Sequence, residues 1–322
     1  MIDRPPAEAR AELAARLEAE LATLRSSQRR ALEALAPRLG PQFEASGDWT
    51  RRLSLLTLLY PWLQAESLTA STLARALPYC VAHALLVLHG FVDDRQIDGQ
   101  ARLSATEAEV SIALRERGLA HLRRLSRRRA WLDAEVAAAA AHYRRAQEAT
   151  YQDGSVDGSA RAEDHRLEVA AGLVAIGRLA PLALAADLGA GPGTLAEMRR
   201  AYDLLAYGLQ WGDDFEDVDE DLERGEKNLL LDALQRKTGG SAQPTDPDRA
   251  RADLVDLGIM EHALETSGDV LRRAATMQRR LGCATLAALI EEKLDRLSRF
   301  AAVLAAAKLV TGYSATRGSS PP

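Results

Sequence analysis

Two short stretches of the sequence gather carboxylates, the side chains that bind hard divalent cations. The first holds Asp93, Asp94 and Asp98, directly after an apolar run that ends at Val92. The second runs from 213 to 221, where seven of the nine residues are acidic, and it also follows an apolar run. Such oxygen ligands suit Mg²⁺, which completes its coordination shell with water and substrate phosphate.

The spacing within the second stretch predicts a row of carboxylates on one helix face. Asp213, Asp217 and Asp221 are spaced i, i+4 and i+8, and a helix with about 3.6 residues per turn places them on one side. Like charges in such a row repel one another, and a bridging cation reverses the sign of that interaction. An acidic run is more often a solvated face or a tail, so this stretch alone does not decide for a metal site.

Both acidic stretches are expected at the C-terminal end of a buried helix. The helix dipole is already negative there, so clustered carboxylates destabilise that end. Solubility does not explain this placement, whereas a shared cation does. The sequence therefore predicts one site in which the two stretches face each other across an apolar cavity and hold several Mg²⁺ ions around a diphosphate.

The elements that must position these carboxylates are helices. Ala and Leu dominate a composition that is 47% hydrophobic and only 5% aromatic, which favours helix. No alternating apolar and polar pattern with turn signals predicts a strand. We expect an all-α, single-domain bundle of about ten helices around a central apolar cavity. N-terminal helices at 1–46 would pack on a main domain at 47–312, with a tail at 313–322.

Several helix boundaries follow from local signals. Ser104 and Glu107 form the pattern of a capping box and predict a helix start. One helix is expected from about Arg161 to Leu188, and two last helices at roughly 249–281 and 284–310. The N-terminal helices carry leucines at helical spacing, and the sequence leaves open whether these pack on the core or on a second subunit.

Charge and cysteine content exclude some classes of function. The net charge is −5 and the basic residues are scattered, so no nucleic-acid surface is expected. Cys80 and Cys283 lie far apart without a CxxC pattern and are expected to be small buried hydrophobes in a reducing compartment.

The apolar segments are too short or too interrupted for a stable membrane span, and the N-terminus has no signal pattern. We expect a cytoplasmic protein.

These motifs resemble those of a known superfamily. The chain is similar, from roughly Gly47 to Val310, to the class I isoprenoid synthases, which comprise trans-prenyltransferases, squalene and phytoene synthases and terpene cyclases. The run 93–98 resembles their first aspartate-rich motif in a DDxxxD form. The run 213–221 resembles the second. The resemblance implies an all-α fold, a Mg²⁺-dependent reaction and an isoprenyl diphosphate substrate.

The second motif is the more informative of the two. From Leu209 to Leu229 the sequence is similar to phytoene and squalene synthases, where an Asp-Val-x-Glu-Asp core precedes Arg-Gly and a basic residue. The terpene-cyclase form has ligands at a spacing of four and four. Together the motifs imply metal ligands at Asp93, Asp94, Asp98, Asp213, Asp214, Asp217 and Asp221, with Asp93, Asp94, Asp213 and Asp217 as the catalytic set, and three Mg²⁺ ions when diphosphate is bound.

The resemblance also implies residues that contact the substrate. The basic candidates for the diphosphate are Arg51, Arg52, Arg102, Arg166, Arg224 and Lys227. The aromatic candidates for the carbocation are Phe91, Tyr207 and Trp211, because the face of an aromatic ring attracts cations. For each aromatic residue alone, ordinary core packing is the commoner role.

Two departures from the prenyltransferase pattern decide between reactions. The Gly-Gly-Lys-Arg segment of that family reads Gly47-Asp48-Trp49-Thr50-Arg51-Arg52 here, and Leu103 replaces the second arginine after the first motif. Those groups bind isopentenyl diphosphate in the family. The expected function is therefore a terpene synthase that ionises a linear isoprenyl diphosphate, releases pyrophosphate, and cyclises or rearranges the cation.

Two alternatives stay open. One is a prenyl diphosphate synthase or head-to-head coupling enzyme on the same fold. The other is a helical scaffold subunit that has lost the chemistry. A homodimer is implied by the resemblance only.

Overall fold

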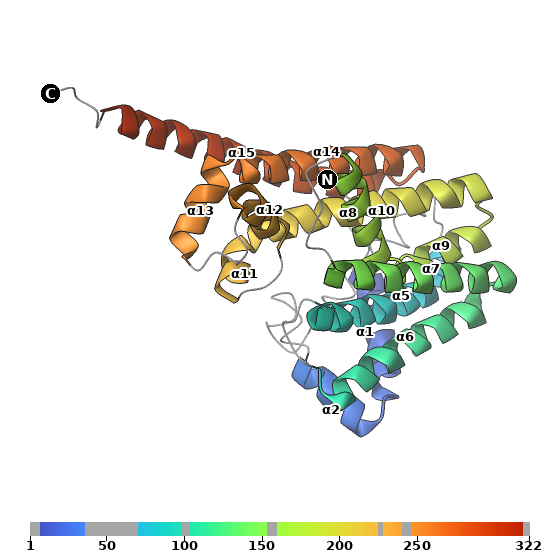
Figure 1. Cartoon of the computed structure of the whole chain (residues 1–322). Helices are drawn as coiled ribbons and strands as arrows, with labels where there is room; N and C mark the ends of the chain where they lie inside the picture. Colours follow the sequence, from blue (N-terminus) through green and yellow to red (C-terminus); the bar gives the residue numbers. More distant parts are fainter. Residues whose placement is uncertain are drawn as a thin grey trace.

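The computed structural model describes residues 7–35, 70–97, 103–152, 160–224, 228–239 and 246–317, and within these ranges it contains thirteen helices and no strand (Figure 1). The all-α prediction is confirmed. The helices exceed the expected number because three segments predicted as single helices are divided: those at 161–188 and 249–281, and the helix that leads into the second acidic stretch.

The helices in chain order are α1 (Ala7–Ala22), α2 (Ser26–Leu35), α5 (Ala70–Ile97), α6 (Ala105–Leu125), α7 (Arg129–Gln152), α8 (Ala160–Leu173), α9 (Leu179–Asp187), α10 (Pro192–Glu216), α11 (Val218–Arg224), α12 (Leu229–Thr238), α13 (Pro247–Asp256), α14 (Ile259–Arg280) and α15 (Ala284–Arg317). The last helix continues past 313, where the tail was expected to begin.

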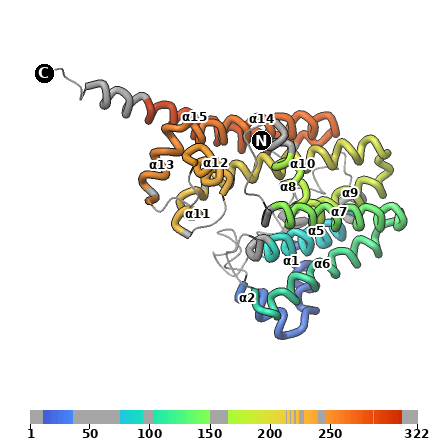
Figure 2. The backbone as a smooth tube through the Cα atoms, in the orientation of Figure 1, coloured from blue at the N-terminus to red at the C-terminus, as the bar shows by residue number. Residues whose placement is uncertain are grey.

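The two helices that lead into the acidic stretches run in the same direction. In Figures 1 and 2, α5 and α10 both run from right to left, so their C-terminal ends lie at the same end of the molecule. Helix α14 packs along α10, α15 packs along α14, and α6 packs along α5. One hydrophobic cluster lies around α10 and α14, and another lies around α5.

The N-terminal helices pack on this chain's own core. Leu13 and Leu17 of α1 are fully buried in the cluster that also holds Leu85 and Leu88 of α5 and Leu114 of α6. Of the two partners that the sequence left open, the structure therefore places α1 and α2 against α5 and α6.

The helix expected from 161 to 188 is divided by a turn at 174–178. Pro181 explains the break. A proline inside a continuous helix removes one backbone hydrogen bond and its ring clashes with the carbonyl four residues earlier, here that of Gly177. Within the first turn of α9, where backbone N–H groups have no helical partner, Pro181 is tolerated.

The helix expected at 249–281 is also divided, at Leu257 and Gly258. Gly258 has φ +69°, a left-handed conformation that ends a right-handed helix and is accessible to glycine at no steric cost. The result is two helices, α13 and α14.

One described stretch is long and apolar enough to cross a membrane, Arg75–Asp93 of α5, and 72% of it is buried inside the protein. That degree of burial is typical of a core helix. Cys80 and Cys283 are both free and buried, as the sequence predicted.

Candidate functional site

Asp93 is held by side chains from three helices. Tyr143 of α7 donates a hydrogen bond of 3.0 Å to its Oδ2, and Ser111 of α6 donates one to its Oδ1. The imidazole Nδ1 of His89, one turn earlier on α5, lies 3.6 Å from the same Oδ1. The carboxylate remains 21% exposed, so it is oriented by the protein and still accessible.

His89 belongs to this arrangement as a neutral donor. Its Nδ1 lies 2.7 Å from Ser111 Oγ, and because that hydroxyl donates to Asp93, its oxygen accepts from the imidazole. Burial lowers the pKa of His89. The charge of Asp93 raises this pKa, and the charge of Arg115 lowers it further. His89 is therefore a hydrogen-bonded core residue.

The capping box of α6 positions Ser111. The backbone N–H of Ser104 donates to Glu107 Oε2 at 2.7 Å, and that of Glu107 donates to Ser104 Oγ at 3.3 Å. This cap, which the sequence predicted, fixes the start of α6, seven residues before Ser111.

The row of carboxylates predicted on one face of the second acidic stretch is wrong, because the helix breaks. Helix α10 ends at Glu216, Asp217 lies at the break, and α11 begins at Val218. Stacked like charges at a helix C-terminus destabilise that turn, and this repulsion is the physical reason for the break. The N–H of Asp221 still bonds to the carbonyl of Asp217 at 2.9 Å, so these two share the first turn of α11.

Asn228 ties the second acidic stretch together. Its Nδ2 donates to the backbone carbonyl of Asp214 and to Asp221 Oδ2, both at 2.7 Å. The carboxylate of Asp214 in turn accepts the N–H of Leu229 at 2.8 Å. Two carboxylates from either side of the break are thereby fixed relative to the start of α12.

A buried cation lies beside this stretch. Lys293 of α15 is 8% exposed, and a Cβ at Gly212 would lie 3.2 Å from its Cε. Gly212 directly precedes Asp213, so α15 supplies positive charge at the point where α10 becomes acidic. On α5, a Cβ at Gly90 would meet no atom of the described residues within 4 Å, one turn before Asp94.

The donor set at this end fits a hard divalent cation. Asp214 and Asp221 are half-buried, Asp217 is exposed, and Asp93 is oriented and accessible, and carboxylate oxygens are the ligands that Mg²⁺ prefers. Within the described ranges no three acidic, histidine or cysteine side chains are arranged to hold a metal ion. The following predicted residues lie outside the described part of the chain, wholly or in their side chains: Arg51, Arg52, Asp94, Asp98, Arg102, Asp213, Arg224 and Lys227.

The predicted aromatic residues lie in packed surroundings. Tyr207 and Trp211 are 3% and 1% exposed within the cluster shared with α14, and the Trp211 ring stands edge-on to His262 at 6.0 Å. Tyr202, nine residues before Trp211 and so half a helical turn around from it, faces α5, where its hydroxyl lies 3.4 Å from His83. Phe91 is half-buried against the N-terminal cluster.

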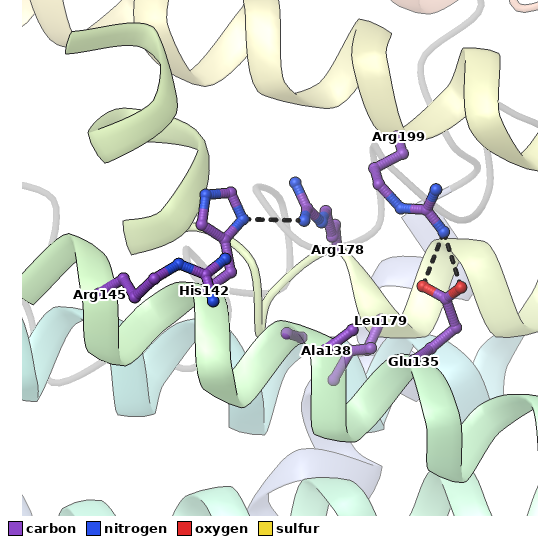
Figure 3. Close-up of a pocket in the computed structure, with 8 residues that line it drawn as sticks. Glu135, Ala138, His142, Arg145, Arg178, Leu179 and Arg199 are labelled. Carbon is purple, nitrogen blue, oxygen red and sulfur yellow. Dashed lines mark hydrogen bonds and ion pairs between the residues drawn. The ribbon is translucent and has the colours of Figure 1, made fainter. Parts of the chain in front are cut away.

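Sequence reasoning missed the residues that support the carboxylates. Tyr143, Ser111, Asn228 and Lys293 come from four other helices or loops, and nothing in their spacing connects them to the acidic stretches. It also missed a charged pocket between α7, α9 and α10, shown in Figure 3. Arg166, predicted to contact diphosphate, is half-buried on α8 and has no ion pair within the described residues.

The chain matches known proteins in fold but not in sequence. No protein-family model matches the chain, and no curated protein matches it in sequence. Solved structures do match. A geranylgeranyl pyrophosphate synthase from Lactobacillus brevis superimposes with a TM-score of 0.68 at 16% identity, covering 91% of this chain and 96% of its own.

Two further structures agree with the first. The geranylgeranyl pyrophosphate synthetase of the archaeon Geoglobus acetivorans matches with a TM-score of 0.66 at 16% identity, over 89% of this chain and 97% of its own. A polyprenyl synthase from Caulobacter crescentus, complexed with calcium and isoprenyl diphosphate, matches with a TM-score of 0.65 at 16% identity, over 88% and 94%. The chain therefore has the all-α fold of the class I isoprenoid synthases, as these prenyl diphosphate synthases represent it.

Proposed function

We propose that this protein is a Mg²⁺-dependent isoprenoid synthase that ionises an allylic isoprenyl diphosphate. One observation carries the proposal. Two helices of the shared fold, α5 and α10, run in the same direction and bring both acidic stretches to one end of the molecule (Figure 1). A carboxylate cluster at a helix C-terminus is unfavourable without a cation, and here there are two.

The chain's own residues orient the ligands and balance their charge. Tyr143 and Ser111 hold Asp93, and Asn228 holds Asp214 and Asp221, so the carboxylates are preorganised. Bound Mg²⁺ would act as a Lewis acid on the diphosphate leaving group. The apolar faces of the surrounding helices would exclude water, which otherwise quenches a carbocation to an alcohol.

Prenyl transfer to a second diphosphate is the reaction that the comparisons favour. The matching structures are named as geranylgeranyl or polyprenyl synthases, so they support chain elongation better than the cyclisation expected from the sequence. Cyclisation is the second candidate reaction, and the residue that supports it is Leu103. The side chain at this position is apolar and half-buried, where the family pattern has a second arginine.

Product analysis distinguishes the two. The protein is incubated with C10, C15 and C20 allylic diphosphates and Mg²⁺, with and without isopentenyl diphosphate. Longer diphosphates formed only with isopentenyl diphosphate support transfer, and hydrocarbons or alcohols formed without it support cyclisation. Asp94→Ala and Asp217→Asn should each abolish turnover, and a fully active Asp94→Ala enzyme would refute the proposal.

A scaffold without chemistry remains the non-enzymatic alternative. Calorimetry with pyrophosphate in the presence and absence of Mg²⁺ tests it. Binding that requires Mg²⁺ and is lost in Asp217→Asn supports a working site at the acidic end. No Mg²⁺-dependent binding, together with no turnover of any allylic diphosphate, would favour the scaffold.

A further inference from the structure

The charged pocket between α7, α9 and α10 is lined by none of the residues predicted from the sequence (Figure 3). Its volume is about 320 Å³, at the lower end of the range for small-molecule sites. The lining residues are Glu135, Ala138, Ala139, His142, Arg145, Arg178, Leu179 and Arg199. Three guanidinium groups therefore converge on one small space.

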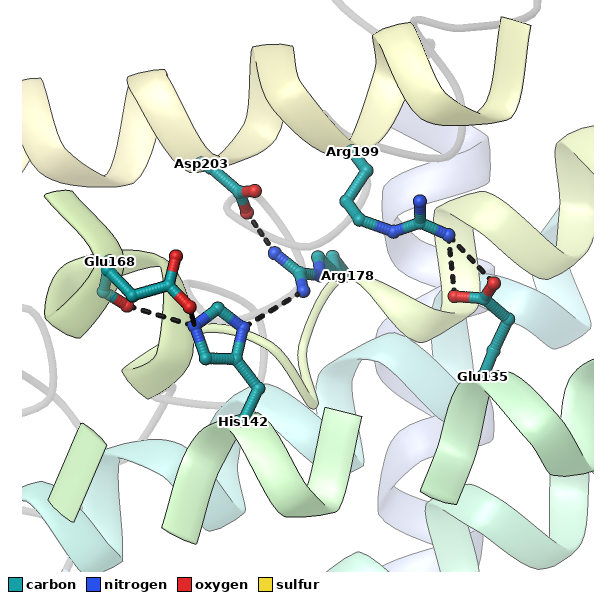
Figure 4. Close-up of polar contacts among 6 residues, drawn as sticks. All are labelled: Glu135, His142, Glu168, Arg178, Arg199 and Asp203. Carbon is teal, nitrogen blue, oxygen red and sulfur yellow. Dashed lines mark hydrogen bonds and ion pairs between the residues drawn. The ribbon is translucent and has the colours of Figure 1, made fainter. Parts of the chain in front are cut away.

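Arg178 is the most buried of the three. It is 6% exposed, and it lies in the turn that separates α8 from α9. It donates to Asp203 of α10 and, at 3.4 Å, to His142 Nδ1 (Figure 4). A guanidinium carries five N–H donors, so three of them have no partner within the described residues.

His142 is held between Glu168 and Arg178. Its Nε2 lies 3.0 Å from both the carbonyl and the carboxylate of Glu168, which places the ring proton on that side. Nδ1 then accepts from Arg178. The carboxylate of Glu168 is 65% exposed and lies on the far side of the ring from Arg178, so it screens the pocket little.

The other two arginines keep donors available as well. One nitrogen of Arg199, Nη2, contacts both oxygens of Glu135 at 2.7 Å, which leaves Nε and Nη1 without a described partner. Arg145 is exposed and makes no ion pair within the described residues. Burial raises the pKa of the Asp203 carboxyl, and Arg178 opposes this rise.

The pocket is distinct from the second acidic stretch. Arg199 precedes Asp213 by fourteen residues on α10, which is about 21 Å of helix at about 1.5 Å per residue. On α7 the two sites are neighbours but face different ways, since Tyr143 contacts Asp93 while His142 lines the pocket. A diphosphate held by the acidic ends would not reach Arg199.

We propose that this pocket binds the phosphoryl group of a small molecule, without a metal ion. Planar guanidinium donors match the oxygens of a phosphoryl group, and such charge-assisted pairs are strong when desolvated. Ala138, Ala139 and Leu179 form an apolar wall for the carbon part of the ligand. Occupancy would add a shared ligand between α7, the turn before α9, and α10, which the pairs Arg199–Glu135 and Arg178–Asp203 already link.

The test is calorimetric titration of the full chain with inorganic phosphate and pyrophosphate in EDTA. We expect binding by the wild type, and a Kd about tenfold or more higher in Arg145→Ala and in Arg199→Gln, since each removes charge-assisted donors. Arg144→Ala is the matched control, because Arg144 is the exposed neighbour of Arg145 and does not line the pocket.

Asp217→Asn separates this proposal from the proposed function. It should bind phosphate in EDTA as the wild type does, although it loses turnover. Failure of the wild type to bind either anion would overturn the proposal, as would equal weakening in Arg144→Ala or loss of binding in Asp217→Asn. If Arg199→Gln does not fold, as judged by circular dichroism, Arg145→Ala decides alone, because it alters an exposed side chain.

Discussion

Asp93 depends on hydroxyl groups from two other helices. The hydrogen bond from Tyr143, at 3.0 Å, and that from Ser111 satisfy one oxygen each. A carboxylate fixed in this way presents its remaining lone pairs in one direction, so it loses little conformational entropy when it binds a cation. At the residue scale, the function of the acidic end therefore depends on neutral neighbours as much as on the carboxylates.

Removing the Tyr143 hydroxyl tests this dependence. We expect Tyr143→Phe to raise the Mg²⁺ concentration required for half-maximal turnover by about tenfold to a hundredfold, as is typical for residues that orient metal ligands. Tyr79→Phe is the control, because Tyr79 donates to Asp187 far from the acidic end. An unchanged Mg²⁺ requirement in Tyr143→Phe would show that Asp93 needs no such support.

The pH dependence of stability tests the buried ion pair of Asp203. Burial raises the pKa of this carboxyl above its ordinary value of 3.8, although Arg178 opposes the shift. The folded chain then binds more protons than the unfolded chain over part of the acid range. The stability that Asp203 contributes is full below the unfolded pKa and is lost as the pH rises through the folded pKa.

We therefore compare the wild type with Asp203→Asn in urea at a series of pH values. The free energy of unfolding of the wild type, relative to the variant, should rise as the pH is lowered from about 7 to about 4. Asp133→Asn is the control, since Asp133 is an exposed carboxylate paired with Arg123 on the protein surface. A relative stability that falls with decreasing pH would contradict the assignment.

At the scale of elements, close packing between α7 and α8 sets the position of both sites. Gly172 allows this approach, because a Cβ there would collide with Ala146 and lie 3.0 Å from the backbone oxygen of His142. Neither neighbour is the far end of a flexible side chain, so neither can move away without shifting a helix.

Gly172→Ala should therefore destabilise the protein by about 1–3 kcal/mol through overpacking. Gly193→Ala is the matched control, because a Cβ at this position in the first turn of α10 would meet no atom of the described part of the chain within 4 Å. It should be stabilising by about 0.4–1 kcal/mol, since alanine restricts the unfolded chain. Urea denaturation measures both, and equal effects would show that the α7–α8 contact is not close.

Asn228 links an element boundary to the acidic end. Its Oδ1 accepts the N–H of Leu230 at 2.8 Å as the cap of α12, while its Nδ2 holds Asp221. Asn228→Asp keeps the cap oxygen and replaces the donor with a repelling charge.

We expect Asn228→Asp to lower the free energy of unfolding, because the new carboxylate would be buried beside Asp221, and to reduce turnover at limiting Mg²⁺ by about tenfold or more. Asp246→Asn, at the exposed cap of α13, is the matched control and should leave turnover unchanged. Kinetic assays across Mg²⁺ concentrations measure both. Equal turnover in Asn228→Asp and the wild type would show that the Nδ2 contact does not orient Asp221.

At the scale of the whole molecule, the N-terminal helices are part of the core. Leu17 is fully buried in a cluster shared with α5 and α6, so its truncation should leave a cavity next to the helix that carries Asp93. We expect Leu17→Ala to lower the free energy of unfolding by about 2–5 kcal/mol. Glu18→Ala, at an exposed neighbouring position, is the control. A change in Leu17→Ala as small as in the control would mean that α1 is only loosely attached.

The helical class, the cap of α6 and the two acidic stretches can be predicted from local sequence alone. Each of these depends on neighbours within about one helical turn, where spacing and residue type decide the physics. The breaks at 174–178 and at Gly258 also have local signals, Pro181 and Gly258. The long apolar periodicity on both sides of each break favours a continuous helix, so the sequence predicts one helix in each case.

Which side chains meet depends on how the helices pack. Tyr143, Ser111 and Asn228 reach the carboxylates, and Arg145, Arg178 and Arg199 converge on one pocket, because helices distant in sequence pack at particular rotations. A shift of one residue turns a helix face by about 100°, and sequence spacing carries no information on the rotation of one helix against another. The direction shared by α5 and α10 is likewise a property of the packed bundle (Figure 2), and it is what brings two separately unfavourable charge clusters to one end.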